Sequence, residues 1–248
     1  MTLVQTGAPQ REQPSFRPSA IKSLFDEMVD TYGIASTLAS LGYTRRWRAQ
    51  CVAAARIRPG MTVCDLMAGT GEAWPAIIRR LEGAGRIVAV DFSAGMLEQA
   101  AQHASLARVA IDLLHEDVFH TSLPNASADC VVSTFGLKTC APEQLPLLAR
   151  EIARILKPGG TCSLIEISVP SAHWLSWPYL WYINHVIPAI ARLLRGNPEN
   201  YRMLGRYTEQ FDSCATMATH MRQAGLEVES VAYLGGCASG IVGTRPGR

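Results

Sequence analysis

Apolar residues in the central part of the chain follow two alternating spacings. Short continuous apolar runs alternate with stretches in which apolar residues recur every three or four positions. The runs predict buried strands and the stretches predict helices, and their alternating order is typical of a mostly parallel sheet. We therefore expect a doubly wound α/β fold around a mostly parallel seven-stranded sheet, a Rossmann-like arrangement. The expected strands are 62–66, 86–90, 110–114, 130–134, 161–167, 227–234 and 238–244, and the expected helices beside them are 72–81, 94–103, 144–156 and 215–224.

Two regions outside the sheet are expected to pack together as a lid. Residues 20–55 carry apolar residues at helical spacing, and a long aromatic insertion at 170–210 follows the fifth expected strand. Residues 1–19 contain three prolines among polar residues, and such a composition cannot bury enough surface to order itself. We therefore expect a disordered tail at 1–19 and one folded domain at 20–248.

Composition narrows the class of protein. A chain of 248 residues, 48% of them hydrophobic, can bury one sizeable core. Its formal charge of +2 comes from interspersed residues, so nucleic acid is not an expected partner. The seven cysteines have no CxxC spacing, which favours reduced thiols in the cytoplasm and indicates no metal site. No apolar run approaches the roughly 20 residues that span a bilayer. We expect a soluble protein, and peripheral membrane contact and homo-oligomer formation stay open.

A turn of small residues follows the first expected strand. Backbone N–H groups in such a turn can approach a ligand closely, at the edge where open α/β sheets bind ligands. A tight structural turn would also need glycine, so this feature alone is a weak signal. The expected ligand contacts in this region are Asp65, Met67, Ala68, Gly69, Thr70 and Gly71.

A carboxylate ends the second expected strand, about 20 residues after the turn. Asp91 could accept hydrogen bonds from both ribose hydroxyls of an adenosine ligand, with Phe92 and Met96 beside it. The alternative is an aspartate that caps the next helix, although Ser93 could do that capping. A nicotinamide dinucleotide would also fit these two features. It is disfavoured because its motif needs a small residue where this chain has Trp74.

Two later strand ends complete the pattern. After the third expected strand, Asp117 could accept a hydrogen bond from an adenine amine while Val118 packs on the ring. Thr134 ends the fourth expected strand and precedes Phe135. The four strand ends together describe a binding site for an adenosine that carries no phosphate.

The ordered motifs of these strand ends give the chain a clear resemblance to a known family. They are D-L-x-x-G-T-G, V-x-V-D-F-S-x-x-M-L, E-D-V, S-T-F-G-L and L-K-P-G-G. The chain resembles class I S-adenosylmethionine (SAM)-dependent methyltransferases, and more narrowly the ubiquinone/menaquinone-biosynthesis (UbiE-like) C-methyltransferase family, over nearly everything after residue 20. The resemblance implies that SAM is the cofactor and S-adenosylhomocysteine its product. It also implies methyl transfer to a small aromatic or polyisoprenoid molecule, as carbon methylation in quinone or natural-product biosynthesis. Carried over by position, the family's cofactor contacts fall on Thr70, Asp91, Asp117, Val118 and Thr134.

The acceptor side departs from the family pattern. Lys138 stands where the family has an arginine, and lysine cannot reproduce the two-pronged contact of arginine with a quinol oxygen. Other departures lie in the two lid regions, which would roof the acceptor. We therefore expect an acceptor other than demethylubiquinol or demethylmenaquinol. The expected acceptor contacts are Tyr32, Phe135, Lys138 and Tyr207.

Carbon methylation of a phenol or quinol needs its hydroxyl to be deprotonated by a side chain or a positioned water. His185, in the expected lid, is the first candidate for the base because histidine titrates near neutrality, and Tyr201 is the second. A histidine on an aromatic helix is also commonly a packing residue. Residues 174–182 could line a substrate tunnel, meet a membrane, or pack in a core or dimer. Two other functions stay open, namely SAM chemistry with coupled cyclisation and a non-catalytic SAM-binding scaffold.

Overall fold

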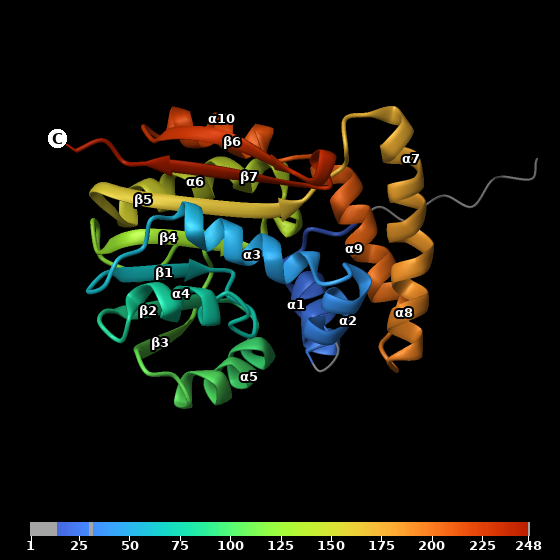
Figure 1. The fold of residues 1–248 in the computed structure, drawn as a ribbon, viewed down its shortest axis with the longest axis horizontal. Coiled ribbons are helices and arrows are strands. Elements are labelled where there is room, and N and C mark those ends of the chain that lie inside the picture. Colours follow the sequence, from blue (N-terminus) through green and yellow to red (C-terminus); the bar gives the residue numbers. More distant parts are fainter. Residues whose placement is uncertain (1–13, 30–31, 248) are drawn as a thin grey trace, which may run out of the picture.

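A seven-stranded sheet with the order β3-β2-β1-β4-β5-β7-β6 forms the centre of the molecule (Figure 1). The computed structural model describes residues 14–29 and 32–247. The strands from β3 to β5 pair in parallel, and β7 runs antiparallel to both of its neighbours. The expected doubly wound α/β fold is therefore confirmed. The strands are β1 Thr62–Leu66, β2 Arg86–Asp91, β3 Ala110–His115, β4 Ala128–Thr134, β5 Leu156–Ile167, β6 Glu227–Tyr233 and β7 Ala238–Thr244.

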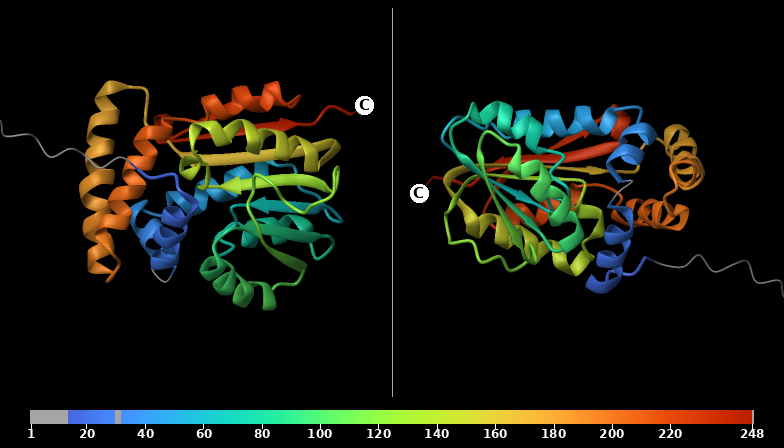
Figure 2. Two further views of the ribbon diagram at one scale, coloured as in Figure 1. Left: turned by 180° about the vertical axis from the view of Figure 1, so that it is seen from behind. Right: turned by 90° about the horizontal axis from the view of Figure 1, so that it is seen from below.

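Helices cover both faces of the sheet, because successive side chains of a strand point to opposite faces. Val63 and Cys130 pack with α3, α4 and α5, whereas Cys64 and Val131 pack with α6 and α10. Figure 2 shows α6 and α10 in front of the sheet when the molecule is seen from behind. Burial on both faces explains why the strands are short continuous apolar runs. The helices of these layers are α3 Tyr43–Ala54, α4 Trp74–Leu81, α5 Ala94–Ser105, α6 Leu145–Ile155 and α10 Ala215–Gln223.

The remaining α-helices and a π-helix form a cap beyond the carboxyl ends of the parallel strands, at the right in Figure 1. Its core includes Ile21 and Met28 from the N-terminal region and Ala191 and Tyr201 from the insertion. The two expected lid regions therefore lie against each other. We call this group the helical cap; it consists of α1 Pro18–Met28, α2 Tyr32–Ala39, α7 His173–Trp181, the π-helix Tyr182–Val186, α8 Ile187–Leu193 and α9 Pro198–Phe211.

The start of the folded region differs from the sequence-based expectation. A disordered tail at 1–19 extends too far, because α1 begins at Pro18 and the Tyr207 hydroxyl donates a hydrogen bond to the Ser15 carbonyl. The Phe16 ring meets the Tyr207 ring edge to face, with 5.3 Å between their centres. Proline is favoured in the first turn of a helix, so Pro18 marks a helix start. Residues 1–13 lie outside the described residues.

Proline also explains two features of the later elements. Helix α6 stops at Ile155 and β5 begins at Leu156, ahead of Pro158, so this strand starts earlier than the expected residue 161. In the cap, the π-helix ends shortly before Pro188, which has no N–H to continue an α-helical hydrogen-bond pattern. No helix in the described part of the chain is long and apolar enough to span a membrane.

Candidate functional site

A cavity lies at the carboxyl ends of the central strands, next to α1. We call it the strand-end cavity. Every expected cofactor contact except Asp65 and Gly71 lines it, so residues spread over four strand ends meet in one place. Asp65 and Gly71 belong to β1 and to the turn after it. The expected contacts in the wall are Met67, Ala68, Gly69, Thr70, Asp91, Phe92, Met96, Asp117, Val118 and Thr134.

The Asp91 carboxylate is held by backbone N–H groups. Its Oδ2 accepts from Gly69 at 2.7 Å, and its Oδ1 accepts from Ser93 at 2.9 Å. Burial raises the pKa of Asp91, and these hydrogen bonds oppose the rise. The cap of α5 is Ser93, whose hydroxyl accepts from the Met96 N–H at 3.2 Å. Asp91 is therefore not needed as the cap, and each of its oxygens keeps a lone pair for a ribose hydroxyl.

Asp65 is buried behind the turn with one oxygen unsatisfied. Its Oδ2 accepts a hydrogen bond from Nε1 of Trp74 at 3.0 Å, and its Oδ1 has no partner among the described residues. Burial raises the pKa of Asp65 to about 7, and the Trp74 hydrogen bond opposes that rise. A buried carboxylate with an unpaired oxygen is costly, so this arrangement suits a site that receives a cation. SAM carries a sulfonium and an ammonium group, so these residues fit it.

The two glycines of the turn have different surroundings. Gly69 has a φ of +56°, and a Cβ built on it would have no atom within 4 Å, so the space beside it is open for a ligand. Gly71 has a φ of +84°, and its Cβ would lie 2.5 Å from the Trp74 ring. Gly71 therefore makes room for Trp74, and it does not line the strand-end cavity. In the sequence, the size of Trp74 argues against a dinucleotide-binding motif, but no pattern indicates that its indole bonds Asp65.

The part of the strand-end cavity that Asp117 and Val118 line suits a flat ring. Val118 is buried in this part, and Asp117 stands beside it at the edge. The Asp117 Oδ1 accepts a hydrogen bond from the Phe119 N–H at 3.0 Å, which orients the carboxylate. An apolar side chain next to an oriented acceptor can hold adenine by its face and by its exocyclic amine.

Helix α1 covers the strand-end cavity. The Ser93 hydroxyl donates a hydrogen bond to Oδ1 of Asp26 at 2.6 Å, which ties α1 to the start of α5. The apolar spacing of this region predicted a helix but not the part of the sheet that it covers. The cavity residues contributed by α1 and the segment before it are Phe16, Pro18, Ile21 and Phe25.

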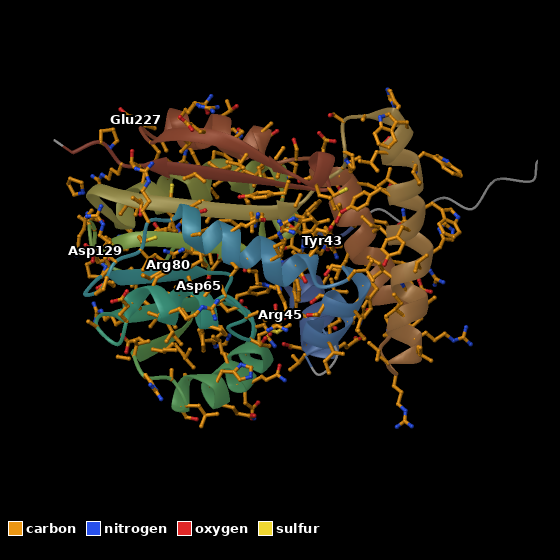
Figure 3. All side chains as sticks on the ribbon, in the orientation of Figure 1. Tyr43, Arg45, Asp65, Arg80, Asp129 and Glu227 are labelled. Atoms are coloured by element: carbon orange, nitrogen blue, oxygen red, sulfur yellow. The ribbon has the colours of Figure 1, made fainter. Side chains whose placement is uncertain are left out.

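A second cavity of about 280 Å³ lies between α3, the end of β5 and the helical cap. We call it the cap cavity. Figure 3 labels Tyr43, one of its residues, where α3 meets the cap. Its walls are mostly apolar and aromatic, as in a site for a ring or an alkyl chain. They consist of Ser36, Ala39, Ser40, Leu41, Tyr43, Thr44, Trp47, Arg48, Phe135, Lys138, Ile167, Tyr179, Tyr182, Ile183, Ile187, Tyr201, Leu204, Gly205, Thr208, Leu234 and Cys237.

Phe135 lines both cavities and has a φ of +67°, which is uncommon for a residue with a side chain. Lys138 holds this backbone in place, because its Nζ donates to the Phe135 carbonyl at 2.8 Å and to Oε1 of Glu166 at 2.9 Å. Oε2 of Glu166 accepts from the Lys138 N–H at 3.0 Å. Lys138 is thus part of the cap-cavity wall and also the anchor of a strained residue between the cavities.

Arg48 links the two cavities. Its guanidinium carbon lies 4.8 Å from the centre of the Phe135 ring, and its Nη2 forms an ion pair with Glu72. Arg48 lines the cap cavity, whereas Glu72 lines the strand-end cavity. Only 4% of Arg48 is exposed, and its Nε has no partner among the described residues. A buried cation in an apolar wall favours an anionic oxygen beside it. The sequence patterns described above assign no role to Arg48.

The two expected catalytic residues lie in different places. Tyr201, in α9, is buried and lines the cap cavity. His185 is exposed, its Nδ1 bonds the Trp181 carbonyl at 2.9 Å, and its ring stacks on the Trp181 ring. His185 is absent from the cap-cavity wall. This position corrects the expectation that His185 reaches the acceptor as a base.

The expected acceptor contacts are also divided. Phe135 and Lys138 line the cap cavity. Tyr207 is buried, but it is not in that wall, and its hydroxyl donates to the Ser15 carbonyl. Its expected acceptor contact is therefore replaced by a link to the segment before α1. Tyr32 begins α2, and its side chain lies outside the described residues.

Comparison with known proteins assigns the family. The model of the ubiE/COQ5 methyltransferase family matches residues 13–247. The chain is 31% identical over 228 residues to the demethylmenaquinone methyltransferase of Lactiplantibacillus plantarum. This match covers 91% of this chain and 95% of that protein. The chain is 32% identical over 236 residues to the demethylmenaquinone methyltransferase of Mycobacterium tuberculosis. This match covers 93% of this chain and 94% of that protein. The fold is shared with the solved structure of the [4+2]-cyclase SpnF, with a TM-score of 0.65. That match covers 96% of this chain and all of the cyclase, at 14% sequence identity. The chain is thus a SAM-dependent methyltransferase that belongs to the ubiE/COQ5 methyltransferase family.

Proposed function

We propose that this enzyme methylates a ring carbon of a hydroxylated aromatic acceptor that carries an apolar side chain. The observation behind this proposal is the cap cavity, an apolar chamber that shares Phe135 with the strand-end cavity and has the buried Arg48 in its wall. Relatives that are named for demethylmenaquinone support an acceptor of this chemical class.

The strand-end cavity is the proposed SAM site. Asp91 would accept from the ribose hydroxyls, Asp117 from the adenine amine, and Asp65 would face positive charge. SAM supplies an electrophilic methyl group when it is bound. The side chains of α1 exclude water from the site, and a dry site strengthens each of these electrostatic contacts.

The cap cavity is the proposed acceptor site. A ring carbon beside a hydroxyl is most nucleophilic after the hydroxyl has lost its proton. Lys138 is engaged by Glu166, but Arg48 has its Nη2 on Glu72 and an Nε without a partner among the described residues. A hydrogen bond from this guanidinium would favour the ionised form of a hydroxyl. We assign Tyr201 the role of orienting the hydroxyl, since its buried side chain lines the same wall. The aromatic walls would hold the ring and keep water away.

Two observations bear on which acceptor is used. The names of the relatives make a demethylated naphthoquinol the first candidate. One contact argues against this candidate. The Lys138 ammonium already donates to Glu166 and to the Phe135 carbonyl, so it cannot replace an arginine that donates to a quinol oxygen. We therefore expect another hydroxylated aromatic to be the better substrate. An acceptor with an isoprenoid tail would reside in a bilayer, so we propose peripheral membrane contact. On the sequence argument from the cysteines, we propose the cytoplasm as the compartment.

A panel of acceptors tests this function. Turnover would be measured with SAM and short-chain demethylated naphthoquinol, demethylated benzoquinol and other hydroxylated aromatics, each beside the ether in which every hydroxyl is methylated. We expect turnover of at least one hydroxylated compound and none of the matched ether, because the ether has no proton to lose. Equal turnover of compound and ether would contradict a role for an ionised hydroxyl.

A further inference from the structure

Exposed large apolar side chains gather on the helical cap. Of those in the described residues, all but Leu106 belong to α2, α7 and α8 or to turns next to them. The turn that contains Leu234 is close to α7, because a Cβ on Gly235 would lie 3.0 Å from the Leu175 side chain. We call this set the cap face. It consists of Ile34, Leu38, Leu41, Trp174, Trp177, Trp181, Leu193 and Leu234.

Helix α7 and the π-helix after it have two different sides. The inner side lines the cap cavity, where the Tyr179 hydroxyl donates to the Cys237 carbonyl at 2.9 Å and the Tyr182 hydroxyl to the Ala39 carbonyl at 2.7 Å. The outer side carries Trp174, which is 80% exposed, and Trp177, which is 74% exposed. Figures 1 and 2 show α7 and α8 at the outer edge of the molecule. Packing within the chain therefore does not explain these two tryptophans.

Arginines are the charged residues of the two segments that carry all of the cap face except Leu234. The segments 32–48 and 167–198 contain no aspartate or glutamate. Their exposed charged residues are arginines, namely Arg45, Arg46, Arg192 and Arg195. Outside these segments, Glu209 of α9 accepts a hydrogen bond from Asn184 of the π-helix, and the exposed Glu199 follows Pro198. Tryptophan beside arginine is typical of a surface that lies in the headgroup region of a membrane with anionic lipids. A symmetric dimer through this face would bring like charges together, which makes a second copy the weaker choice of occupant.

We propose that the cap face docks on an anionic lipid bilayer. Leu41 and Leu234 are exposed and also line the cap cavity, so the cavity reaches the surface at the cap face. A lipid acceptor could then enter from the bilayer without crossing water, since the cavity wall is apolar along the same route. This last step rests on the proposed function, whereas binding of the protein to vesicles does not.

Vesicle flotation tests the docking surface. The whole chain would be mixed with vesicles of equal parts phosphatidylglycerol and phosphatidylcholine, and with vesicles of phosphatidylcholine alone. We expect binding to the anionic vesicles, and at least a tenfold loss of binding in the double variant Trp174→Ser and Trp177→Ser. The matched control is Leu106→Ser, which removes an exposed apolar side chain outside the cap face and should bind like the unmodified protein.

Tryptophan fluorescence gives a second readout of the same event. Trp47 and Trp74 are buried, so acrylamide should quench mainly the three tryptophans of α7, and anionic vesicles should protect them from it. Methyl transfer to a water-soluble short-chain acceptor should be unchanged in the double variant, whichever acceptor the enzyme prefers. Absence of vesicle binding by the unmodified protein would overturn the proposal. So would a dimer in sedimentation that the double variant converts to a monomer while vesicle binding is unaffected.

Discussion

The indole Nε1 of Trp74 donates a hydrogen bond to Oδ2 of Asp65 at 3.0 Å, while Oδ1 of the same carboxylate has no partner in the described structure. One oxygen of Asp65 is thereby fixed, and the other is available to a cationic group of the proposed SAM ligand. Trp74, which is unsuited to a dinucleotide site, thus orients this buried acid.

SAM binding should depend on pH through Asp65. Burial raises the pKa of Asp65 to about 7, so the carboxyl is largely neutral below that pH and must lose its proton to face a cation. We expect SAM affinity to rise between about pH 6 and pH 8, with proton release on binding. Titration calorimetry in two buffers of different ionisation enthalpy measures that proton. In the Asp65→Asn variant the affinity should be lower and the proton release should disappear.

The free energy of unfolding of the ligand-free protein should also depend on pH through Asp65, and its Asp65 contribution should decrease as the pH rises. The folded-state pKa of Asp65 lies above its unfolded value, so the folded state binds this proton more tightly. The contribution of this group to the free energy of unfolding should therefore be full below about pH 4 and decrease as the pH rises towards 7. Urea unfolding of the unmodified protein and of Asp65→Asn isolates this contribution. The same pH dependence in both proteins would exclude Asp65 as its source.

Asp91 should carry the contact with the ribose. Removing its carboxylate deletes two charge-assisted hydrogen bonds, each worth about 1.5 to 3 kcal/mol, so Asp91→Ala should lower SAM affinity at least tenfold. Because Asp91 also holds the backbone of Gly69 and Ser93, Asp91→Asn is the gentler companion variant. The control is Asp112→Ala, which alters a half-exposed carboxylate of β3 outside the cavity. Unchanged affinity in folded Asp91→Ala would falsify the placement of SAM.

Replacing the two glycines of the turn should change SAM binding and the Tm to different extents. In Gly69→Val the side chain points into open space beside the cavity, so SAM binding should be lost, and the Tm should fall through the strain of a branched side chain at a φ of +56°. In Gly71→Val the same backbone strain is joined by a clash with the Trp74 ring, so the Tm should fall further than in Gly69→Val. Thermal melts and calorimetry of both variants separate these effects. Equal losses of Tm would contradict the division of roles.

Tyr201 and His185 offer a matched pair for the acceptor site. Tyr201 is buried in the cap-cavity wall, whereas His185 is exposed outside it. Tyr201→Phe should lower kcat by roughly tenfold or more, because it removes a group that orients the acceptor hydroxyl. His185→Ala should leave kcat unchanged with a soluble acceptor. The reverse result, with His185 essential and Tyr201 dispensable, would restore the histidine as the base.

The sequence predicted the sheet, and it predicted residues at four strand ends that the structure brings to one cavity, because both depend on short local patterns. Buried strands are recognisable as apolar runs, and the expected SAM contacts lie at or just after the ends of strands. The pair of Arg48 and Glu72 joins residues far apart in the chain, and no local pattern indicates it. His185 lies in a π-helix, where the extra residue per turn changes the side of the helix on which a residue falls. Periodicity for an ordinary α-helix could therefore not place its side chain.

The most direct measurement is the position of the transferred methyl group. Product formed from SAM with a ¹³C-labelled methyl group and the best acceptor of the panel would be analysed by NMR. The cap cavity, with Arg48 and Lys138 in its wall, predicts a new methyl on a ring carbon next to a hydroxyl, and at least tenfold less of this product from Arg48→Gln. A methyl group on oxygen, or full product from Arg48→Gln, would contradict methylation of an ionised hydroxyl-bearing ring in this cavity.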